Sequence, residues 1–251
     1  MTYPFDFSGK VALVTGSSRG IGAGLVTAFD RCGARCVLNF VADPEGRNRT
    51  DAERVALGLR DALLIQCDVG DAAQVGAMMA QVRDQCGELD ILINNAGILR
   101  DRTIQKMSPD EWESVLRVNL SGTFNCIQKA ADLLRPGGRV VNLASVSGHI
   151  GSFGQANYAA SKAGIMALTK VAARELARRQ ITVNAVAPGV VKTEIIREMP
   201  DSALQGFLAQ IPLARLAEVE DIVGPVLYLC SPLAAYVTGH VLDVNGGLHM
   251  A

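Results

Sequence analysis

The sequence contains no long apolar run and no excess of either charge. Its longest apolar stretch, Ile222 to Cys230, is interrupted by Gly224 and Pro225, and it is far shorter than the about 20 residues that a membrane-spanning helix needs. The formal net charge is −1 and there are no long basic runs, which argues against nucleic acid as the main partner. We therefore expect neither a membrane nor a nucleic acid as a partner.

The sequence also lacks paired cysteines. Its six cysteines and three histidines are scattered, without a CxxC pair. In a chain of this size such cysteines are more often buried thiols than disulfides or metal ligands. Because His149, His240 and His249 are equally dispersed, we expect no metal site. The first ten residues lack the basic-then-apolar form of a signal peptide, so a soluble cytoplasmic protein is expected.

Short β-branched runs alternate with longer segments of helical periodicity, which is typical of a parallel sheet covered by helices on both faces. The apolar run from Val11 to Val14 suits a strand that is buried on both sides. With 251 residues and no linker or repeat, the prediction is a single Rossmann-like α/β domain over residues 1–251. About seven strands are expected, near Lys10–Thr15, Cys36–Val41, Ala62–Cys67, Leu89–Ile93, Arg139–Leu143, Thr182–Val186 and Val241–Val244.

Helices are expected between the strands. Asp71 and Ser108 suit helix caps, and Pro109 suits a first helical position. The Pro136-Gly137-Gly138 sequence is expected to end the longest helix. The stretch from Pro188 to Pro212 is compatible with either a lid over the active site or a plain surface connection. The predicted helices are Ile21–Arg31, Ala72–Gln85, Pro109–Leu134, Asn157–Arg178 and Val219–Cys230.

A glycine-rich turn, Thr-Gly-Ser-Ser-Arg-Gly-Ile-Gly from Thr15 to Gly22, follows the first predicted strand and opens the first helix. Glycines permit a tight turn and close backbone approach, while a helix N-terminus offers N–H groups and a positive dipole to a pyrophosphate. The spacing is TGxxxGxG rather than GxGxxG, and an ordinary strand-to-helix turn is the alternative. The position after the first strand favours dinucleotide binding.

Tyr158 and Lys162 lie four residues apart on a predicted helix and therefore share one face. A nearby cation is expected to lower the pKa of the tyrosine below its usual value of about 10. Tyr158 can protonate an alkoxide formed by hydride attack, and Ser145 can hydrogen-bond the carbonyl oxygen. Each residue alone has an ordinary structural role, but together with a dinucleotide turn they predict hydride transfer coupled to proton transfer.

In chain order, these motifs resemble those of the short-chain dehydrogenase/reductase family from about Phe7 to Met250. The resemblance implies a catalytic tetrad of Asn119, Ser145, Tyr158 and Lys162. In it, Lys162 holds the nicotinamide ribose and Asn119 positions a water that leads a proton toward Lys162. The motifs that carry the resemblance are Thr15–Gly22, Asn94–Gly97, Asn119, Ser145, Tyr158-x-x-x-Lys162 and Pro188-Gly189.

Within the family the chain most resembles 3-oxoacyl-[acyl-carrier-protein] reductases, through the segments Gln155–Lys162, Ile181–Gly189 and Val237–Gly247. Related ketone reductases share these segments. The resemblance implies reduction of a β-ketoacyl substrate on acyl carrier protein. The alternatives are other β-keto thioesters, ketones or secondary alcohols and, from another class, a non-catalytic dinucleotide-sensing module.

The resemblance implies substrate contacts from Ser145, Gln155 and Tyr158. We expect the rest of the substrate pocket to gather His149, Ile150, Gly151 and the 190–210 segment. The resemblance and the glycine turn together imply a larger set of cofactor contacts. These are Gly16, Ser17, Ser18, Arg19, Gly20, Ile21, Gly22, Asn39, Asp68, Val69, Asn95, Ala96, Gly97, Tyr158, Lys162, Pro188, Gly189, Val191 and Thr193.

NADPH is favoured over NADH as the cofactor. NAD-binding proteins often place a carboxylate at the end of the second strand, but Asn39-Phe40-Val41 has none and Asp43 precedes Pro44, where a turn is expected. Arg19 could pair with a 2′-phosphate, with Arg47 or Arg49 as substitutes. An exposed arginine without a specific role is the alternative for Arg19.

Family resemblance implies a homotetramer that pairs the helices near Pro109–Leu134 and Asn157–Arg178, and the C-terminal strand region. Apolar side chains such as Ile165, Leu168 and Leu176 could equally face the chain's own sheet. Four basic residues could dock an acidic carrier protein or could form ordinary solvated helix faces. They are Lys129, Arg135, Arg178 and Arg179.

Overall fold

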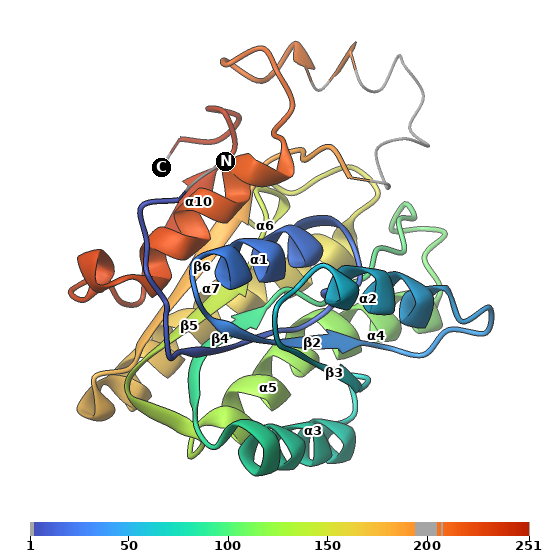
Figure 1. Cartoon of the computed structure of the whole chain (residues 1–251). Helices are drawn as coiled ribbons and strands as arrows, with labels where there is room; N and C mark the ends of the chain where they lie inside the picture. The colour runs from blue at the N-terminus through green and yellow to red at the C-terminus, as the bar shows by residue number, and fades with distance from the viewer. Residues whose placement is uncertain (1–2, 194–204, 207, 251) are drawn as a thin grey trace.

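A parallel sheet of seven strands forms the centre of the computed structural model (Figure 1), which describes residues 3–193, 205–206 and 208–250. The strand order is β3-β2-β1-β4-β5-β6-β7. Strands β2 and β3 therefore lie on one side of β1, and β4 to β7 follow in order on its other side. The strands are β1 Val11–Val14, β2 Arg35–Phe40, β3 Ala62–Gln66, β4 Leu89–Asn94, β5 Leu134–Leu143, β6 Thr182–Pro188 and β7 Val241–Val244.

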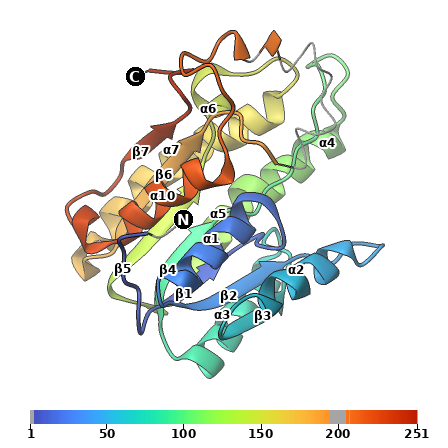
Figure 2. The same ribbon diagram turned by 45° about the horizontal axis from the view of Figure 1, so that its top comes forward.

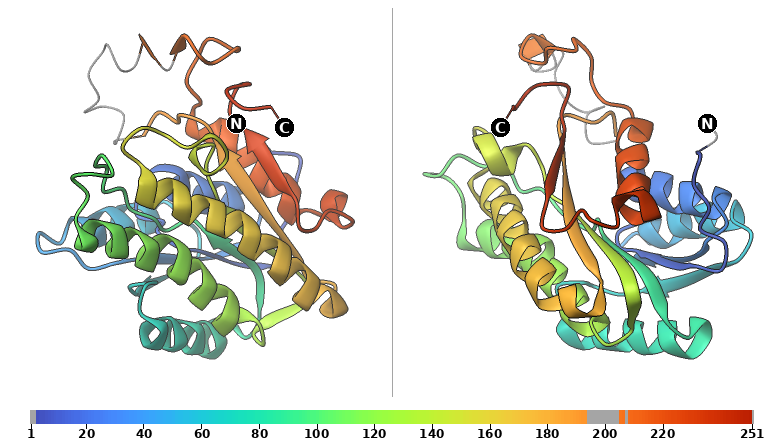
Figure 3. Two further views of the ribbon diagram at one scale, coloured as in Figure 1. Left: turned by 180° about the vertical axis from the view of Figure 1, so that it is seen from behind. Right: turned by 90° about the vertical axis from the view of Figure 1, so that its left-hand side faces the viewer.

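Helices cover both faces of the sheet (Figures 2 and 3). On one face, α1 and α10 pack on the sheet through Phe29, Val226 and their neighbours. On the other face, α3, α5 and α7 enclose a second core that contains Met78 and Ile127. The helices are α1 Gly20–Arg31, α2 Arg47–Leu57, α3 Ala72–Cys86, α4 Pro109–Val115, α5 Gly122–Ala130, α6 Ser147–Ile150, α7 Ala156–Leu176 and α10 Val219–Cys230.

The central strands are largely apolar because both of their faces are covered. All four residues of β1 are buried, and so are all six of β4 and all seven of β6. β7 is one of the two edge strands, and all four of its residues are partly exposed. The doubly wound parallel sheet expected from the sequence is confirmed, and each predicted strand corresponds to an observed one.

The predicted helix caps are confirmed. The Asp71 carboxylate accepts hydrogen bonds from the N–H groups of Ala73 and Gln74 at the start of α3, and these bonds lower the pKa of Asp71. Ser108 forms a reciprocal capping box with Glu111 at the start of α4, and Pro109 occupies the first turn. Such caps satisfy N–H groups that have no partner within the helix.

The prediction of one long helix from Pro109 to Leu134 holds for residues 109–130, which are helical without a break, but the helix ends four residues before Leu134. A π-helical segment, Leu116–Ser121, separates α4 from α5, and α5 ends at Ala130. Pro136-Gly137-Gly138 therefore ends no helix and lies inside β5. There the register passes from Leu89 beside Leu134 to Ile91 beside Arg139. The proline and glycines form a bulge, which is where a sheet tolerates them.

Helix α2 was missed because it is polar and only Ala52 among its residues is buried, so its apolar periodicity is weak. The predicted turn at Asp43 is confirmed. Its carboxylate accepts hydrogen bonds from the N–H groups of Arg47 and Asn48 at the start of α2, and its carbonyl oxygen accepts one from Gly46.

The predicted buried thiols are confirmed. All six cysteines are free; five are buried and Cys86 is partly exposed. Among the described residues, no helix is both long enough and apolar enough to cross a membrane. Residues 194–204 and 207 of the 188–212 stretch, for which the sequence suggested a lid or a surface connection, lie outside the described residues.

Candidate active site

A cavity of about 660 Å³ opens at the carboxyl ends of the central strands. It lies where the strand order reverses between β1 and β4, the usual ligand site of doubly wound sheets. All predicted cofactor residues except Ser17 line this cavity. Residues that the sequence analysis did not select also line it: Phe40, Val41, Asn48, Cys67, Ile98, Leu99, Arg117, Val118, Leu143 and Ala144.

The glycine-rich turn brings the start of α1 against this cavity. Gly16 has a φ of 62°, a left-handed conformation that glycine adopts without strain. A Cβ atom on Gly22 would lie 2.4 Å from the carbonyl oxygen of Gly16 and 2.6 Å from Nδ2 of Asn95. The same Asn95 Nδ2 donates hydrogen bonds to the carbonyl oxygens of Thr15 and Gly16. The turn is therefore compact, with the N–H groups of a helix start beside the cavity.

Asn39 and Ser17 hold the turn to the sheet. Asn39 accepts a hydrogen bond from the Gly16 N–H and donates one to the carbonyl oxygen of Cys67. Ser17 is fully buried, and its hydroxyl accepts a hydrogen bond from the Asn39 N–H. Ser17 therefore lies behind the cavity wall. Asn39 forms hydrogen bonds to the segments on both sides of β2.

Helix α7 carries Tyr158 and Lys162 on the cavity wall, with the Lys162 ammonium nitrogen 5.4 Å from the centre of the Tyr158 ring. Ser145, just after β5, also lines the cavity, and its hydroxyl is near enough to Tyr158 to influence the pKa of the phenol. The Nζ atom of Lys162 donates a 2.6 Å hydrogen bond to the carbonyl oxygen of Leu143. The fold thus brings together the three residues that the sequence placed in one reaction.

The expected lowering of the tyrosine pKa was wrong for this unliganded structure. Burial raises the pKa of Tyr158, while the nearby Ser145 hydroxyl acts in the opposite direction and the charge of Asp101 raises the pKa further. Burial also lowers the pKa of Lys162 to about 8. Desolvation thus favours the neutral form of both groups, and the phenol is protonated at neutral pH, as a proton donor must be.

Asn119 lies in the π-helical segment and is fully buried. Its Oδ1 accepts a hydrogen bond from the Ile98 N–H, and its Nδ2 donates to the Ile98 carbonyl oxygen and to Ser161 Oγ. The side chain therefore joins the loop after β4 to α7. A Cβ atom on Gly97 would lie 3.3 Å from Asn119 Oδ1 and 3.8 Å from Lys162 Nζ. The water-positioning role of Asn119 stays a prediction.

Four predicted substrate-pocket residues, His149, Ile150, Gly151 and Gln155, do not line the cavity. Gln155 donates a hydrogen bond to Asp101 and accepts one from the Ser147 hydroxyl. His149 lies against Asp243. Both follow Ser145 closely in the sequence, but the short helix α6 and the turn after it direct them to other partners. Of the selected substrate-contacting residues, Ser145 and Tyr158 line the cavity.

Arg19 lies at the end of the cavity nearest α2, where a 2′-phosphate is expected. Its guanidinium donates hydrogen bonds to Asn48 Oδ1 at 2.6 Å and Asp51 Oδ2 at 2.9 Å. Arg49 instead lies over the Phe40 ring and donates to Gln66. Asn48 and Arg117 had no local signal in the sequence, because only the packing of α2 and the π-helical segment beside β2 and β4 brings them to the cavity.

Lys129, Arg135, Arg178 and Arg179 do not line the cavity, and their role as a dock for a carrier protein stays a prediction. Lys129 is near the end of α5, Arg135 is at the start of β5, and Arg178 and Arg179 precede β6. They therefore lie at the amino ends of the strands, across the sheet from the cavity. Arg135 pairs with Glu88, and Arg179 donates to the carbonyl oxygens of Ala131 and Leu134, so these two have structural partners.

A doubly wound sheet with a glycine turn at its switch point and a Tyr–Lys pair on the cavity wall defines an oxidoreductase that uses a nicotinamide dinucleotide. The model of the family described as Enoyl-(Acyl carrier protein) reductase matches residues 16–249. The chain belongs to the short-chain dehydrogenase/reductase family.

Several known proteins are similar to the chain over nearly its whole length. The 3-oxoacyl-[acyl-carrier-protein] reductase FabG of Staphylococcus aureus is 46% identical over 96% of this chain and 98% of its own. The protein of the same name from Salmonella typhimurium is 41% identical over 98% of this chain and 99% of its own. A solved short-chain dehydrogenase/reductase from Brucella melitensis, described as SDR:Glucose/ribitol dehydrogenase, covers 100% of both chains with a TM-score of 0.92 and 30% identity.

Proposed function

We propose that this protein reduces a 3-oxoacyl thioester carried on acyl carrier protein to the 3-hydroxyacyl form, with NADPH as the reductant and Tyr158 as the proton donor. The observation that carries the proposal is the gathering of Ser145, Tyr158 and Lys162 in one cavity with the glycine turn. The relatives of 41% and 46% identity are named for this substrate, which supports its choice over other ketones.

The glycine turn fits a dinucleotide, because Gly16 and Gly22 leave the backbone free to approach a pyrophosphate at the start of α1. Asp68 and Val69 are proposed for the adenine end of the cofactor, and Gly189, Val191 and Thr193 for its nicotinamide end. When bound, the reduced cofactor supplies the hydride for the carbonyl carbon. Every other step falls to the side chains of this chain.

Ser145 and Tyr158 act on the oxygen of the carbonyl group. We propose that both hydroxyls hydrogen-bond it and fix its position, which also stabilises the negative charge that develops on it. Tyr158 then transfers its proton to that oxygen, which gives the hydroxyl product and leaves a phenolate. Lys162, with its nitrogen 5.4 Å from the ring centre, stabilises the phenolate when the lysine is charged and, with Asn119, returns a proton to it.

NADPH is proposed over NADH because no carboxylate follows β2 at the cavity, where Phe40, Val41 and Asn48 are found instead. Arg19 supplies a guanidinium at this end, and its partner Asp51 comes from α2. A 2′-phosphate would replace the Asp51 carboxylate as the partner of the Arg19 guanidinium. One anion replaces another, so the arginine stays paired.

The test is a side-by-side assay of reduction with acetoacetyl-acyl carrier protein, acetoacetyl-CoA and simple ketones, each with NADPH and NADH. We expect kcat/KM to be highest for the carrier-bound substrate with NADPH. Higher kcat/KM for a free ketone would refute the substrate, and a marked preference for NADH would refute the cofactor. Dinucleotide binding without turnover on any carbonyl compound would refute the enzymatic proposal.

We also propose that the protein is a homotetramer in which α5 and α7 pair between copies. Ile165 is buried, and Leu168 and Leu176 pack on the chain's own core, so these side chains are used internally. Phe124 on α5 and Val171 on α7 are 46% and 52% exposed, and they suit a contact with a second copy. Light scattering on the purified protein and on a Phe124→Glu variant tests this: loss of the tetramer in the variant is expected, and a monomeric parent protein would overturn it.

A further inference from the structure

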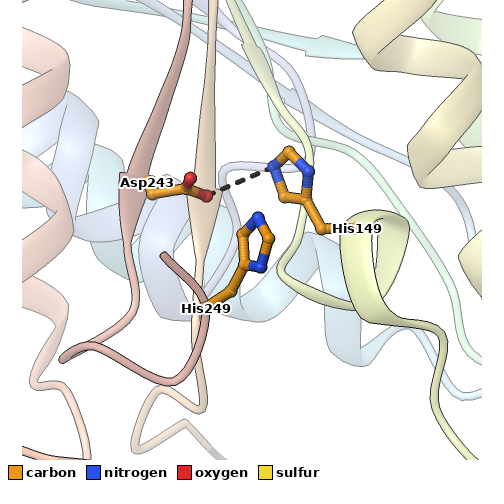
Figure 4. Close-up of side chains that lie close together, drawn as sticks. All are labelled: His149, Asp243 and His249. Carbon is orange, nitrogen blue, oxygen red and sulfur yellow. Dashed lines mark ion pairs between the residues drawn. The ribbon is translucent and has the colours of Figure 1, made fainter. Parts of the chain in front are cut away.

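Three side chains from distant parts of the chain meet beside the catalytic cavity (Figure 4). They are His149, Asp243 and His249, and one nitrogen or carboxylate oxygen of each lies within 4.8 Å of those of the other two. The Nε2 atom of His149 is 3.2 Å from Oδ1 of Asp243. The two imidazole rings are stacked with their centres 4.5 Å apart.

The backbone holds these side chains in place from three directions. His149 belongs to α6, which is anchored by a hydrogen bond from the Val146 N–H to the Pro188 carbonyl oxygen. Asp243 is in β7, directly beside Ala187 of β6. The turn before His249 is fixed by Asn245, whose Oδ1 accepts hydrogen bonds from the N–H groups of Gly247 and His249. The cluster is therefore built on ordered backbone next to Pro188, a residue of the cavity wall.

The contacts of Asp243 indicate a ligand rather than a simple ion pair. Its Oδ1 atom is buried, and among the described residues it has no hydrogen-bond partner, although His149 Nε2 is close by. A buried carboxylate oxygen without a donor is costly. A cation between the carboxylate and the two imidazoles would satisfy this oxygen, since their lone pairs are suitable ligands for a divalent transition metal.

The distances between the ligand atoms are close to those of tetrahedral zinc, and one of the two stacked imidazoles must also turn, because an imidazole binds a metal in the plane of its ring. Two ligand atoms bound to such an ion lie about 3.3 Å apart, because each metal–ligand bond is about 2.0 Å. The 3.2 Å between His149 and Asp243 already matches this edge, and the third ligand atom, within 4.8 Å, needs a movement of roughly 1–1.5 Å to close the set.

We propose that His149, Asp243 and His249 form a binding site for a divalent transition metal of the zinc type. Three protein ligands leave one coordination position open, to be filled by water. The bound ion joins α6 to β7 and the C-terminal segment, so it stabilises the wall of the cavity from outside. It has no part in the proton transfer proposed for Tyr158, and the site holds whether or not the proposed substrate is correct.

Metal binding to the full-length protein, first freed of metal by a chelator, tests the site. Titration with Zn²⁺ in a calorimeter is expected to give one ion per chain with a dissociation constant in the micromolar range or tighter. Co²⁺ is expected to give the visible absorption of a four-coordinate complex with nitrogen and oxygen ligands. Zn²⁺ is also expected to raise the melting temperature, because it binds the folded chain.

Matched variants separate this site from weak binding at the surface. His149→Gln, Asp243→Asn and His249→Gln are each expected to weaken Zn²⁺ binding at least tenfold and to abolish the Co²⁺ absorption. The control is His240→Gln, which removes the remaining histidine, an exposed one outside the cluster, and is expected to leave binding unchanged. Dissociation constants above about 0.1 mM, or equal binding by the three cluster variants and the parent, would overturn the proposal.

Discussion

The ammonium nitrogen of Lys162 lies 5.4 Å from the centre of the Tyr158 ring, and burial acts on the two groups in opposite directions. It raises the pKa of the tyrosine and lowers that of the lysine to about 8. Both effects favour the neutral forms, because the cavity offers little water to solvate a charge. The unliganded site therefore holds a protonated phenol next to a lysine that loses its charge under mildly alkaline conditions.

Replacing Tyr158 by phenylalanine removes the proposed proton donor and keeps the ring. We expect kcat for carbonyl reduction to fall by roughly 10²- to 10⁴-fold, the usual contribution of a general acid. Steady-state rates of NADPH oxidation measure this, and a fluorescence titration of NADPH is the control. Dinucleotide affinity should change little, because the glycine turn is untouched. An unchanged reduction rate would end the proposed mechanism.

The lowered pKa of Lys162 predicts a dependence of stability on pH. Below about pH 8 the folded protein carries a buried ammonium, which Lys162→Met would remove. Between about pH 8 and 10.5 only the unfolded chain binds this proton, so the wild-type protein gains stability relative to the variant as the pH rises. The gain is about 1.4 kcal/mol per pH unit and about 3 kcal/mol in total.

Urea denaturation of both unliganded proteins, at fixed concentration from pH 7 to 10, measures this difference. Comparing the two proteins at each pH is essential, because burial raises the pKa of Cys36 and Cys67 to about 12. Because of these thiols, the free energy of unfolding of both proteins falls equally as the pH rises. The difference between the two proteins at each pH is therefore free of this effect. A stability difference that stays constant over this range would contradict the assigned pKa of Lys162.

The pairing of Arg19 with Asp51 predicts a change in cofactor preference. Arg19→Ala removes a charge-assisted contact to a 2′-phosphate, and we expect KM for NADPH to rise about 10- to 100-fold. KM for NADH should change far less, because NADH lacks that phosphate.

Asp51→Asn is the matched variant for this prediction, since it removes the carboxylate that is 2.9 Å from the Arg19 guanidinium. It should lower KM for NADPH by a few-fold, because the phosphate no longer displaces an anion. Parallel assays with both cofactors measure the two effects. Equal changes in KM for NADPH and NADH in the Arg19 variant would show that Arg19 does not distinguish between them.

The close packing around Gly22 predicts that a single added methyl group will disrupt dinucleotide binding and lower the stability of the fold. In Gly22→Ala the new Cβ would lie 2.4 Å from the Gly16 carbonyl oxygen, so the turn must open. We expect loss of dinucleotide binding and a lower melting temperature. The control is Gly76→Ala in α3, where a Cβ atom would meet no atom within 4 Å among the described residues. That variant should be more stable by about 0.5–1 kcal/mol and bind the dinucleotide normally.

The sequence by itself determined the alternation of strands and helices, because strands buried on both faces are largely apolar and helices repeat their apolar positions. It also placed Tyr158 and Lys162 on one face of α7 and the glycine turn at the start of α1. These are local relations within a few residues, and backbone geometry fixes them without knowledge of the rest of the chain.

Only the tertiary structure decided how charges and distant residues behave. The pKa values of Tyr158 and Lys162 depend on how much water the packed sheet and helices exclude, and no spacing in the sequence encodes that. The basic residues around Arg135 lie at the amino ends of the strands, away from the cavity, because α5 and α7 run antiparallel to the strands and end there. His149 and His249 meet because β7 pairs with β6, which brings the C-terminal segment beside α6.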